Sequence, residues 1–312
     1  MHFHYKKNSL YCEQVSISRI VKEAETPCYI YSHRALVEQF ARLRAAFASV
    51  DPLVCFAMKA NDNLAVVKTL VGQGAGCDIV SEKELAKALR TKADPKKIVF
   101  ASVGKTDEEI IAALKAGILL FNVESRAELD EINRIAGTLK QRAGAALRVN
   151  PDVAAATHDR IVTGTLNKKF GLDLATAGVI LRERSSWPNV EISGIHMHID
   201  SQIKTPEPYA EALNRLLPFL AQVKQDGVDL TYFDVGGGFG ISYDDNHPEH
   251  IEDFARVLVP LLQQTGLKII MEPGRFICGN AGIFVTRTLF VKNNGVKTFI
   301  IVDGGMNDLP RP

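Results

Sequence analysis

The chain has 312 residues, 46% of them hydrophobic and 23% charged, which is the composition of an ordinary globular protein. Its formal net charge of +1 at pH 7 gives no electrostatic reason to expect nucleic acid or an anionic membrane surface as a partner. No apolar stretch is long enough to span a bilayer, and the opening MHFHYKKNSLYCEQ lacks the apolar core of a signal peptide, so we expect no membrane partner and a cytoplasmic protein.

Residues 1–30 predict a β-rich lead-in that packs with a C-terminal β domain and lies outside the main domain. A helix is expected directly afterwards, over residues 33–47. Ser32 is a suitable N-cap for it, and its apolar residues recur at helical spacing.

Eight short apolar runs dominate residues 31–278, and each stops at a polar or charged cluster. The runs are VCFAMK, CDIVS, IVFAS, LLFNVE, AALRVN, ISGIHMHI, YFDVGGG and KIIMEP. Loops or helix-like segments separate them, and Thr106 with Glu109 and Ser125 with Glu128 fit capping boxes. Strands that alternate with helices form parallel sheets, so the pattern predicts an α/β fold, a closed (β/α)8 TIM-type barrel over residues 31–278.

Beyond residue 278 the helical pattern stops. The segment GIFVTRTLFVKNNGVKTFIIVDGG predicts two strands joined at Asn294-Gly295, a strong hairpin signal. We therefore expect a partial all-β domain over residues 279–312. Two strands and a lead-in bury little apolar surface, so we also expect the chain to be truncated at its C-terminal side.

The C-terminal ends of the strands form the active-site face of such a barrel. The residues at those ends are Lys59, Asp78, Ser81, Glu124, Arg148, His198, Ser201, Gly236, Gly237, Gly238, Glu272 and Arg275. Their convergence predicts an enzyme.

Lys59 follows the apolar run VCFAM, so its amine is expected at the rim of a partly desolvated pocket. Desolvation lowers the pKa of a lysine and frees the amine as a nucleophile for a carbonyl. A surface lysine at a strand end is the alternative. The glycines of DVGGGFG follow the seventh run, where barrels often bind phosphate through backbone N–H groups, although a tight turn also explains them.

Glu272 and Arg275, in EPGR after the eighth run, suit a rigid turn. Arg275 is a candidate to complete a phosphate site and Glu272 to hold a proton on a ring nitrogen, while an internal ion pair between them remains the alternative. His196 and His198 share one strand face. A stacking or hydrogen-bonding role fits them at least as well as a metal, because no carboxylate has an obvious ligand spacing and the five cysteines form no CxxC pair.

A lysine amine, a phosphate site, a carboxylate and an imidazole on one face form the set that pyridoxal phosphate requires. The chain resembles the barrel-type pyridoxal-phosphate decarboxylases, which have the alanine-racemase-like fold, and their diaminopimelate branch in particular. The resemblance runs over nearly the whole chain. It includes AMKAN, DIVSEKEL, FNVES, LRVNPDV, HMHIDSQI, DVGGGFG, EPGR and GGMNDLPRP, the last being the segment most specific to that branch.

The resemblance implies pyridoxal 5′-phosphate as cofactor, a small-molecule amino acid as substrate and a homodimer in the full-length form. The implied reaction converts meso-2,6-diaminopimelate to L-lysine and carbon dioxide, the last step of lysine biosynthesis. The implied catalytic residues are Lys59 as the Schiff-base lysine, His198 stacking on the ring, and Glu272 pairing with the pyridine nitrogen. The implied cofactor-binding residues also include Asp78, Arg148, Ser201, Gly236, Gly237, Gly238 and Arg275, and the implied substrate-binding residues are Arg275 and Arg311.

Asp200 departs from the family pattern, which usually has glycine there, and a carboxylate near the phosphate site puts the cofactor affinity in question. Other readings stay open: decarboxylation of ornithine, arginine or a D-amino acid, a barrel racemase, or a cofactor-binding remnant without catalysis. Arg311 favours diaminopimelate as substrate over ornithine, arginine or a D-amino acid, because an arginine binds a distal carboxylate and not a distal amine.

Overall fold

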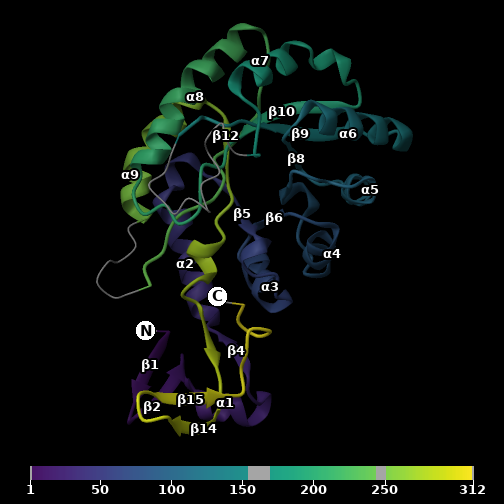
Figure 1. Ribbon diagram of the computed structural model, residues 1–312. Helices are drawn as coiled ribbons and strands as arrows, with labels where there is room; N and C mark the ends of the chain where they lie inside the picture. Colours follow the sequence, from purple (N-terminus) through teal and green to yellow (C-terminus); the bar gives the residue numbers. More distant parts are fainter. Residues whose placement is uncertain (1, 154–168, 244–250, 311–312) are drawn as a thin grey trace.

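The computed structural model describes residues 2–153, 169–243 and 251–310. A barrel surrounded by helices makes up most of the molecule, and the N-terminal strands lie together with the C-terminal hairpin at one end of it (Figure 1).

Eight parallel strands close the barrel in chain order, and the last strand pairs back to the first. The strands are β5 (Leu53–Ala57), β6 (Gly76–Ile79), β7 (Ile98–Ala101), β8 (Leu120–Val123), β9 (Ala143–Arg148), β10 (Val190–His196), β11 (Tyr232–Asp234) and β12 (Lys268–Met271). Each coincides with one of the eight apolar runs. The predicted TIM-type barrel is therefore confirmed.

Strand alternation gives the barrel wall two different faces. The outward-facing side chains join the large apolar core beneath the helices. The inward-facing ones form a separate small apolar cluster of Cys55, Val99, Leu120, Ala146 and Ile270. Toward the C-terminal ends of the strands the buried inward positions become polar, and they are Asp78, Asn122, His196, Asp234 and Glu272. The interior of the barrel therefore changes from apolar to polar along its axis.

The helices cover the outside of the barrel (Figure 1). They are α2 (His33–Ala46), α3 (Leu64–Gly72), α4 (Glu82–Arg90), α5 (Asp107–Ala116), α6 (Arg126–Leu139), α7 (Leu174–Arg182), α8 (Glu207–Gln225), α9 (Ile251–Thr265) and the short α10 (Arg275–Cys278), with 3-10 turns η1 (Ala48–Val50), η2 (Met58–Ala60), η3 (Pro95–Lys97) and η4 (Arg184–Ser186). Ser32 caps α2 as predicted by accepting from the Ala35 N–H. The sequence analysis did not identify α7, whose N-cap is Asp173.

The two predicted capping boxes have different outcomes. Thr106 and Glu109 make both reciprocal hydrogen bonds at the start of α5. At the start of α6, Ser125 accepts from the Glu128 N–H at 3.1 Å, but the Glu128 carboxylate accepts from the Glu124 N–H instead of that of Ser125. The second box is therefore only half formed, because a neighbouring lysine draws the Glu128 side chain toward the barrel.

The lead-in contains the antiparallel sheet of β1 (Phe3–Lys6), β2 (Ser9–Cys12) and β3 (Val15–Ser16), and also a helix, α1 (Ile17–Ala24), that the prediction of a β-rich segment missed. Strand β4 (Cys28–Tyr31) pairs antiparallel with β13 (Gly282–Val285), which joins the two ends of the chain. The division into three domains at residues 30 and 278 stays a prediction.

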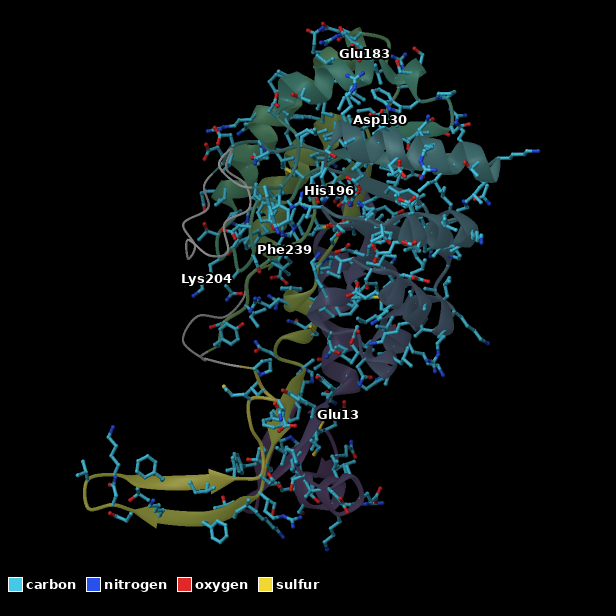
Figure 2. All side chains as sticks on the ribbon, turned by 45° about the vertical axis from the view of Figure 1, so that its right-hand side comes forward. Glu13, Asp130, Glu183, His196, Lys204 and Phe239 are labelled. Atoms are coloured by element: carbon cyan, nitrogen blue, oxygen red, sulfur yellow. The ribbon has the colours of Figure 1, made fainter. Side chains whose placement is uncertain are left out.

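The predicted hairpin around Asn294-Gly295 is present as β14 (Thr288–Asn293) and β15 (Thr298–Val302). It projects away from the barrel with side chains on both of its faces (Figure 2), and several of its large apolar residues are exposed, Phe290 by 69% and Ile300 by 65%. Two strands were predicted for this region, and the structure has three. The additional strand, β13, is not part of the hairpin and pairs with β4 instead. None of the helices in the described ranges is long and apolar enough to cross a membrane.

Candidate active site

Lys59 lies on the 3-10 turn η2, just beyond the end of β5 and not in the strand itself. Its Nζ lies 2.7 Å from Oδ2 of Asp78, which is fully buried at the inner face of β6. The predicted net lowering of the Lys59 pKa is wrong, because the net shift is upward. Burial does lower that pKa, but the carboxylates of Asp78 and Glu272 raise it by more. The side chain of Lys59 is therefore held as an ammonium ion.

The pKa of Asp78 is raised as well. Burial and the nearby Glu272 raise the pKa of its carboxyl to about 7, although the Lys59 ammonium lowers it. Its Oδ1 is buried and has no hydrogen-bond partner among the described residues. The contact of Asp78 is with the lysine, so it acts on the cofactor site through Lys59.

Glu272 follows β12 and points into the barrel, where it is 3% exposed. Its Oε1 accepts a hydrogen bond from Nδ2 of Asn122 at 3.0 Å, and its Oε2 lies 3.2 Å from Nε2 of His196. Burial raises the pKa of Glu272, but the interactions with His196 and with Lys59 outweigh that effect and hold the pKa below its usual value. The carboxyl is therefore an anion, and each of its oxygens has one defined partner.

The alternative of a Glu272–Arg275 ion pair does not describe the structure, because the two side chains contact different groups. Arg275 is exposed at the start of α10 and donates from Nη1 to the hydroxyl of Tyr243. Arg275 thus remains at the mouth of the barrel, where a ligand can reach it.

His198 follows β10 and lies beside the glycine segment. Its Nδ1 accepts from the N–H of Gly237 at 3.3 Å, which leaves the ring proton on Nε2. Burial, together with the charges of Arg148 and Lys59, lowers the pKa of His198 well below its usual value. The imidazole is therefore neutral, as a stacking role requires.

The glycine segment after β11 passes close to other backbone. A Cβ at Gly237 would lie 2.0 Å from the carbonyl oxygen of Glu272, and one at Gly238, where φ is +107°, would lie 2.1 Å from that of Asp200. These approaches leave no room for a side chain. The glycines therefore have a packing reason in addition to the predicted phosphate-binding one.

Tyr209 on α8 fixes this segment, a role that sequence reasoning missed. Its hydroxyl donates to the Gly237 carbonyl at 2.5 Å. Its ring stacks on Phe239 at 5.2 Å between centroids, and Phe254 packs against both rings edge-on. Phe239 and His196 lie in the same part of the barrel (Figure 2). An aromatic cluster thus anchors the chain just beyond the glycines.

Arg148, at the end of β9, is held by two neighbours. Its Nη1 donates to Oε1 of Glu124 at 2.7 Å, and its guanidinium lies 4.7 Å from the ring centroid of Phe170. Both members of the ion pair are buried. The structure therefore shows Arg148 in a buried ion pair, and the contact with the cofactor that the resemblance implies stays a prediction.

The remaining predicted residues lie near the mouth. Ser201 is half-buried and donates its N–H to Oδ1 of Asp200 at 2.6 Å. Asp200 itself is fully buried, so its carboxylate turns toward the adjacent backbone. Ser81 caps α4 by accepting from the Glu84 N–H. Arg311 lies outside the described residues.

His196, Asp234 and Glu272 bring ligand-type atoms within 4.8 Å of one another. Sequence reasoning did not find carboxylate partners for His196, because they come from β11 and the end of β12. Both oxygens of Glu272 already have partners, Asn122 on one and His196 on the other. Asn122 offers a hydrogen-bond donor here, so the group forms a hydrogen-bonded cluster around the carboxylate.

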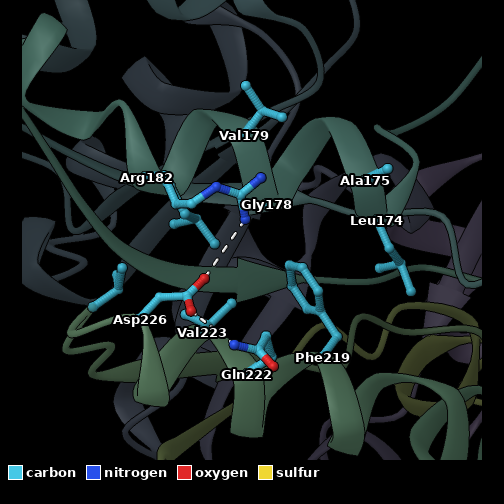
Figure 3. A pocket seen from close by; sticks show the side chains of 11 residues that line it. Leu174, Ala175, Gly178, Val179, Arg182, Phe219, Gln222, Val223 and Asp226 are labelled. Carbon is cyan, nitrogen blue, oxygen red and sulfur yellow. Dashed lines mark hydrogen bonds and ion pairs between the residues drawn. The ribbon is translucent and has the colours of Figure 1, made fainter.

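A cavity of about 240 Å³ lies elsewhere, between α7 and α8 on the outside of the barrel (Figure 3). Apolar residues line most of it, and Arg182 and Asp226 form an ion pair at 3.6 Å across one side. None of the predicted site residues lines it. The chemistry therefore concentrates at the barrel mouth.

Residues 33–279 match the family model of the pyridoxal-dependent decarboxylases, described as their pyridoxal-binding domain. The chain is 46% identical over 310 residues to a diaminopimelate decarboxylase from Aquifex aeolicus, covering 99% of this chain and 73% of that protein. The chain belongs to the diaminopimelate decarboxylase family.

Solved structures of the family have the same fold. The diaminopimelate decarboxylase of Helicobacter pylori, complexed with L-lysine, superposes with a TM-score of 0.90 at 38% identity over 95% of this chain and 74% of that one. The enzyme of M. jannaschii, also with L-lysine, gives a TM-score of 0.91 at 31% identity over 99% of this chain and 75% of that one. The resemblance found in the motifs is confirmed.

Pyridoxal 5′-phosphate is the cofactor that the pyridoxal-dependent decarboxylase model implies. The described residues fit it. Lys59 supplies an amine at the mouth, Glu272 supplies an anchored carboxylate, and the glycine segment after β11, whose Gly236 and Gly237 N–H groups donate to Asp234 and His198, lies on the same face as the candidate phosphate site. These are the three requirements of the cofactor: a phosphate site, a lysine and a partner for the ring nitrogen.

Proposed function

We propose that this chain converts meso-2,6-diaminopimelate to L-lysine and carbon dioxide with pyridoxal 5′-phosphate as cofactor. The observation that carries the proposal is the anchored, anionic Glu272 on the same barrel face as the Lys59 amine. The chain is 46% identical to the diaminopimelate decarboxylase of Aquifex aeolicus and 35% identical to that of Zymomonas mobilis, which supports the choice of substrate.

The cofactor, when bound, supplies an electron sink for the electron pair that remains after carbon dioxide leaves. Glu272 would accept a hydrogen bond from the ring N–H and so keep that nitrogen protonated. Lys59, whose Nζ Asp78 holds in place, would be the nucleophile for the cofactor carbonyl once its ammonium has lost a proton to solvent. Neutral His198, whose orientation the hydrogen bond from Gly237 fixes, would stack on the ring.

Phosphate recognition falls to Gly236, Gly237 and Gly238, with Ser201 and Arg275 at the rim of the site. Positive φ angles of 71° at Gly236 and 107° at Gly238 shape this turn of the backbone. Successive backbone N–H groups in such a turn can bind an anion, and here those of Gly236 and Gly237 would have to exchange their present acceptors, Asp234 and His198, for the phosphate. Asp200 is compatible with this arrangement, because its carboxylate is directed to the Ser201 N–H.

Substrate recognition falls to Arg275, exposed at the mouth, and to Arg311, which the resemblance assigns to a carboxylate of the substrate. A guanidinium binds a carboxylate through two parallel hydrogen bonds. A substrate with an amine at the same end gains nothing from it. The arginine pair therefore supports diaminopimelate over ornithine or arginine as substrate.

We also propose a cytoplasmic homodimer, following the family resemblance. The exposed apolar residues of the β14–β15 hairpin support association with a second copy. Sedimentation velocity measures the oligomeric state directly. A monomer at all concentrations tested contradicts this part of the proposal.

The test of the proposal is product analysis. The chain, loaded with pyridoxal phosphate, is incubated with meso-diaminopimelate carrying a labelled carboxyl group, and labelled carbon dioxide and L-lysine are measured, with ornithine as the parallel substrate. Equal amounts of both products from diaminopimelate, and little reaction with ornithine, are expected. Reduction with borohydride followed by peptide mapping should label Lys59, and labelling of another lysine contradicts its role.

A further inference from the structure

Two titratable side chains of the polar layer inside the barrel, His196 and Asp234, have no role in the proposed chemistry, and His196 is the one that contacts Glu272 by a hydrogen bond. His196 extends inward from the end of β10 and is 1% exposed. Figure 2 labels it in the barrel part of the molecule. Among the described residues its side chain has one hydrogen bond, with Glu272. A buried histidine with a single contact to the key carboxylate calls for an explanation.

We propose that His196 is a positioning residue that, together with Asn122, fixes the orientation of the Glu272 carboxylate toward the cofactor ring nitrogen. This inference rests on the proposed cofactor site and deepens it. His196 touches neither cofactor nor substrate in this account. It acts through Glu272.

The geometry supports a two-point clamp. Asn122 reaches Oε1 from β8 at 3.0 Å, and His196 reaches Oε2 from β10 at 3.2 Å. Each carboxylate oxygen has two lone-pair sites, so each keeps one free for the cofactor. Two donors on different oxygens prevent the carboxylate from rotating about its terminal bond. The orientation of the free lone pairs is then set before any ligand arrives.

The protonation state of His196 follows from its partner. An ionised carboxylate only accepts, so Nε2 of His196 must carry the proton that faces Glu272. Nδ1 is buried without a partner among the described residues, and burial lowers the pKa of the ring despite Glu272. The ring is therefore neutral. A neutral donor anchors Glu272 without cancelling the negative charge that attracts a protonated ring nitrogen.

The tautomer can be measured in the unaltered protein. We would label the eight histidines with ¹⁵N, assign His196 by its loss in the His196→Gln spectrum, and record its ring nitrogens by NMR without cofactor. A neutral ring with the proton on Nε2 is expected. A proton on Nδ1 alone, or on both nitrogens, overturns the proposal.

The matched pair of variants is His196→Gln and His196→Leu. Glutamine retains an N–H donor at similar reach, whereas leucine fills the volume without a donor. If His196 only fills space, the two behave alike. If it anchors Glu272, only leucine impairs the site.

The readout is the ¹⁵N chemical shift of the pyridine nitrogen in ring-labelled cofactor bound to each protein. Loss of a hydrogen bond to a charged group is expected to lower the proton affinity of that nitrogen by about 10- to 100-fold in His196→Leu, while His196→Gln stays within a few-fold of wild type. Equal proton affinities in wild type and His196→Leu overturn the inference alone. Failure of the wild type to bind cofactor overturns the proposed function, and the inference falls with it.

Discussion

Lys105 offers a sharp test of how the site is supported. Its side chain is fully buried, and its Nζ lies 2.5 Å from Oε1 of Glu128. The same ammonium donates at 2.8 Å to the carbonyls of Ser102 and Asn122. It therefore ties the end of β7 to the residue of β8 whose side chain clamps Glu272. Burial lowers the pKa of Lys105, although Glu128 opposes that effect.

Lys105→Met removes the cation and leaves Glu128 and two carbonyls without it. Removing one partner of a buried ion pair costs about 3–5 kcal/mol of unfolding free energy. With a urea dependence of about 3 kcal/mol per molar, the unfolding midpoint should fall by about 1–2 M. Trp187 is the sole tryptophan and is buried in the barrel part, so its fluorescence reports the unfolding of the barrel.

Two controls accompany this variant. Lys115→Met changes an exposed lysine near the end of α5 and should shift the unfolding free energy by no more than about 0.5 kcal/mol. Lys105→Met combined with Glu128→Gln removes both charges and should be more stable than Lys105→Met alone. A Lys105→Met protein as stable as wild type, or a double variant no better than the single one, refutes the reasoning.

Three further predictions address the site itself. Gly238→Ala places a Cβ 2.1 Å from the carbonyl of Asp200 and should weaken cofactor binding by about 100-fold or more, measured by equilibrium dialysis. Gly74→Ala has a similar positive φ but open space around it, so it should cost about 1–2 kcal/mol of stability and leave cofactor binding unchanged; equal effects on binding would contradict the proposed phosphate site. Glu272→Gln should slow carbon dioxide release by about 100-fold or more with cofactor still bound, and near-normal turnover would contradict its role. The raised pKa of Asp78, about 7 against 3.8, means that its contribution to the stability of the cofactor-free protein is complete below pH 3.8 and is lost as pH rises through about 7. The free energy of unfolding, measured with urea at a series of pH values, should therefore depend less on pH between 3.8 and about 7 in Asp78→Asn than in wild type. The same pH dependence in both proteins would contradict the raised pKa of Asp78.

The barrel could be predicted from the sequence because each strand carries its own local signal. An apolar run that stops at a polar residue marks both the strand and the end that faces the active site, as at Asp78 or Glu272. The hairpin turn at Asn294-Gly295 and the N-cap Ser32 are equally local. Helix α7 was not predicted, although Asp173 caps it, because its sequence carries no capping box.

The contacts of the site could not be predicted in the same way, because they join residues far apart in the chain. Asn122 and His196 reach Glu272 across 150 and 76 positions. Separation in sequence also explains why the predicted direction of the Lys59 pKa shift was wrong. Its apolar neighbours in sequence suggest desolvation alone, whereas Asp78, 19 positions away, supplies the opposing charge.

The most direct test of the central claim is the visible absorption spectrum of the purified chain with pyridoxal phosphate, recorded before and after meso-diaminopimelate is added. The account predicts an absorption band of bound cofactor that is absent in Lys59→Ala and that changes when the amino acid arrives. A wild-type spectrum identical to that of free pyridoxal phosphate, unaffected by the amino acid, would contradict it.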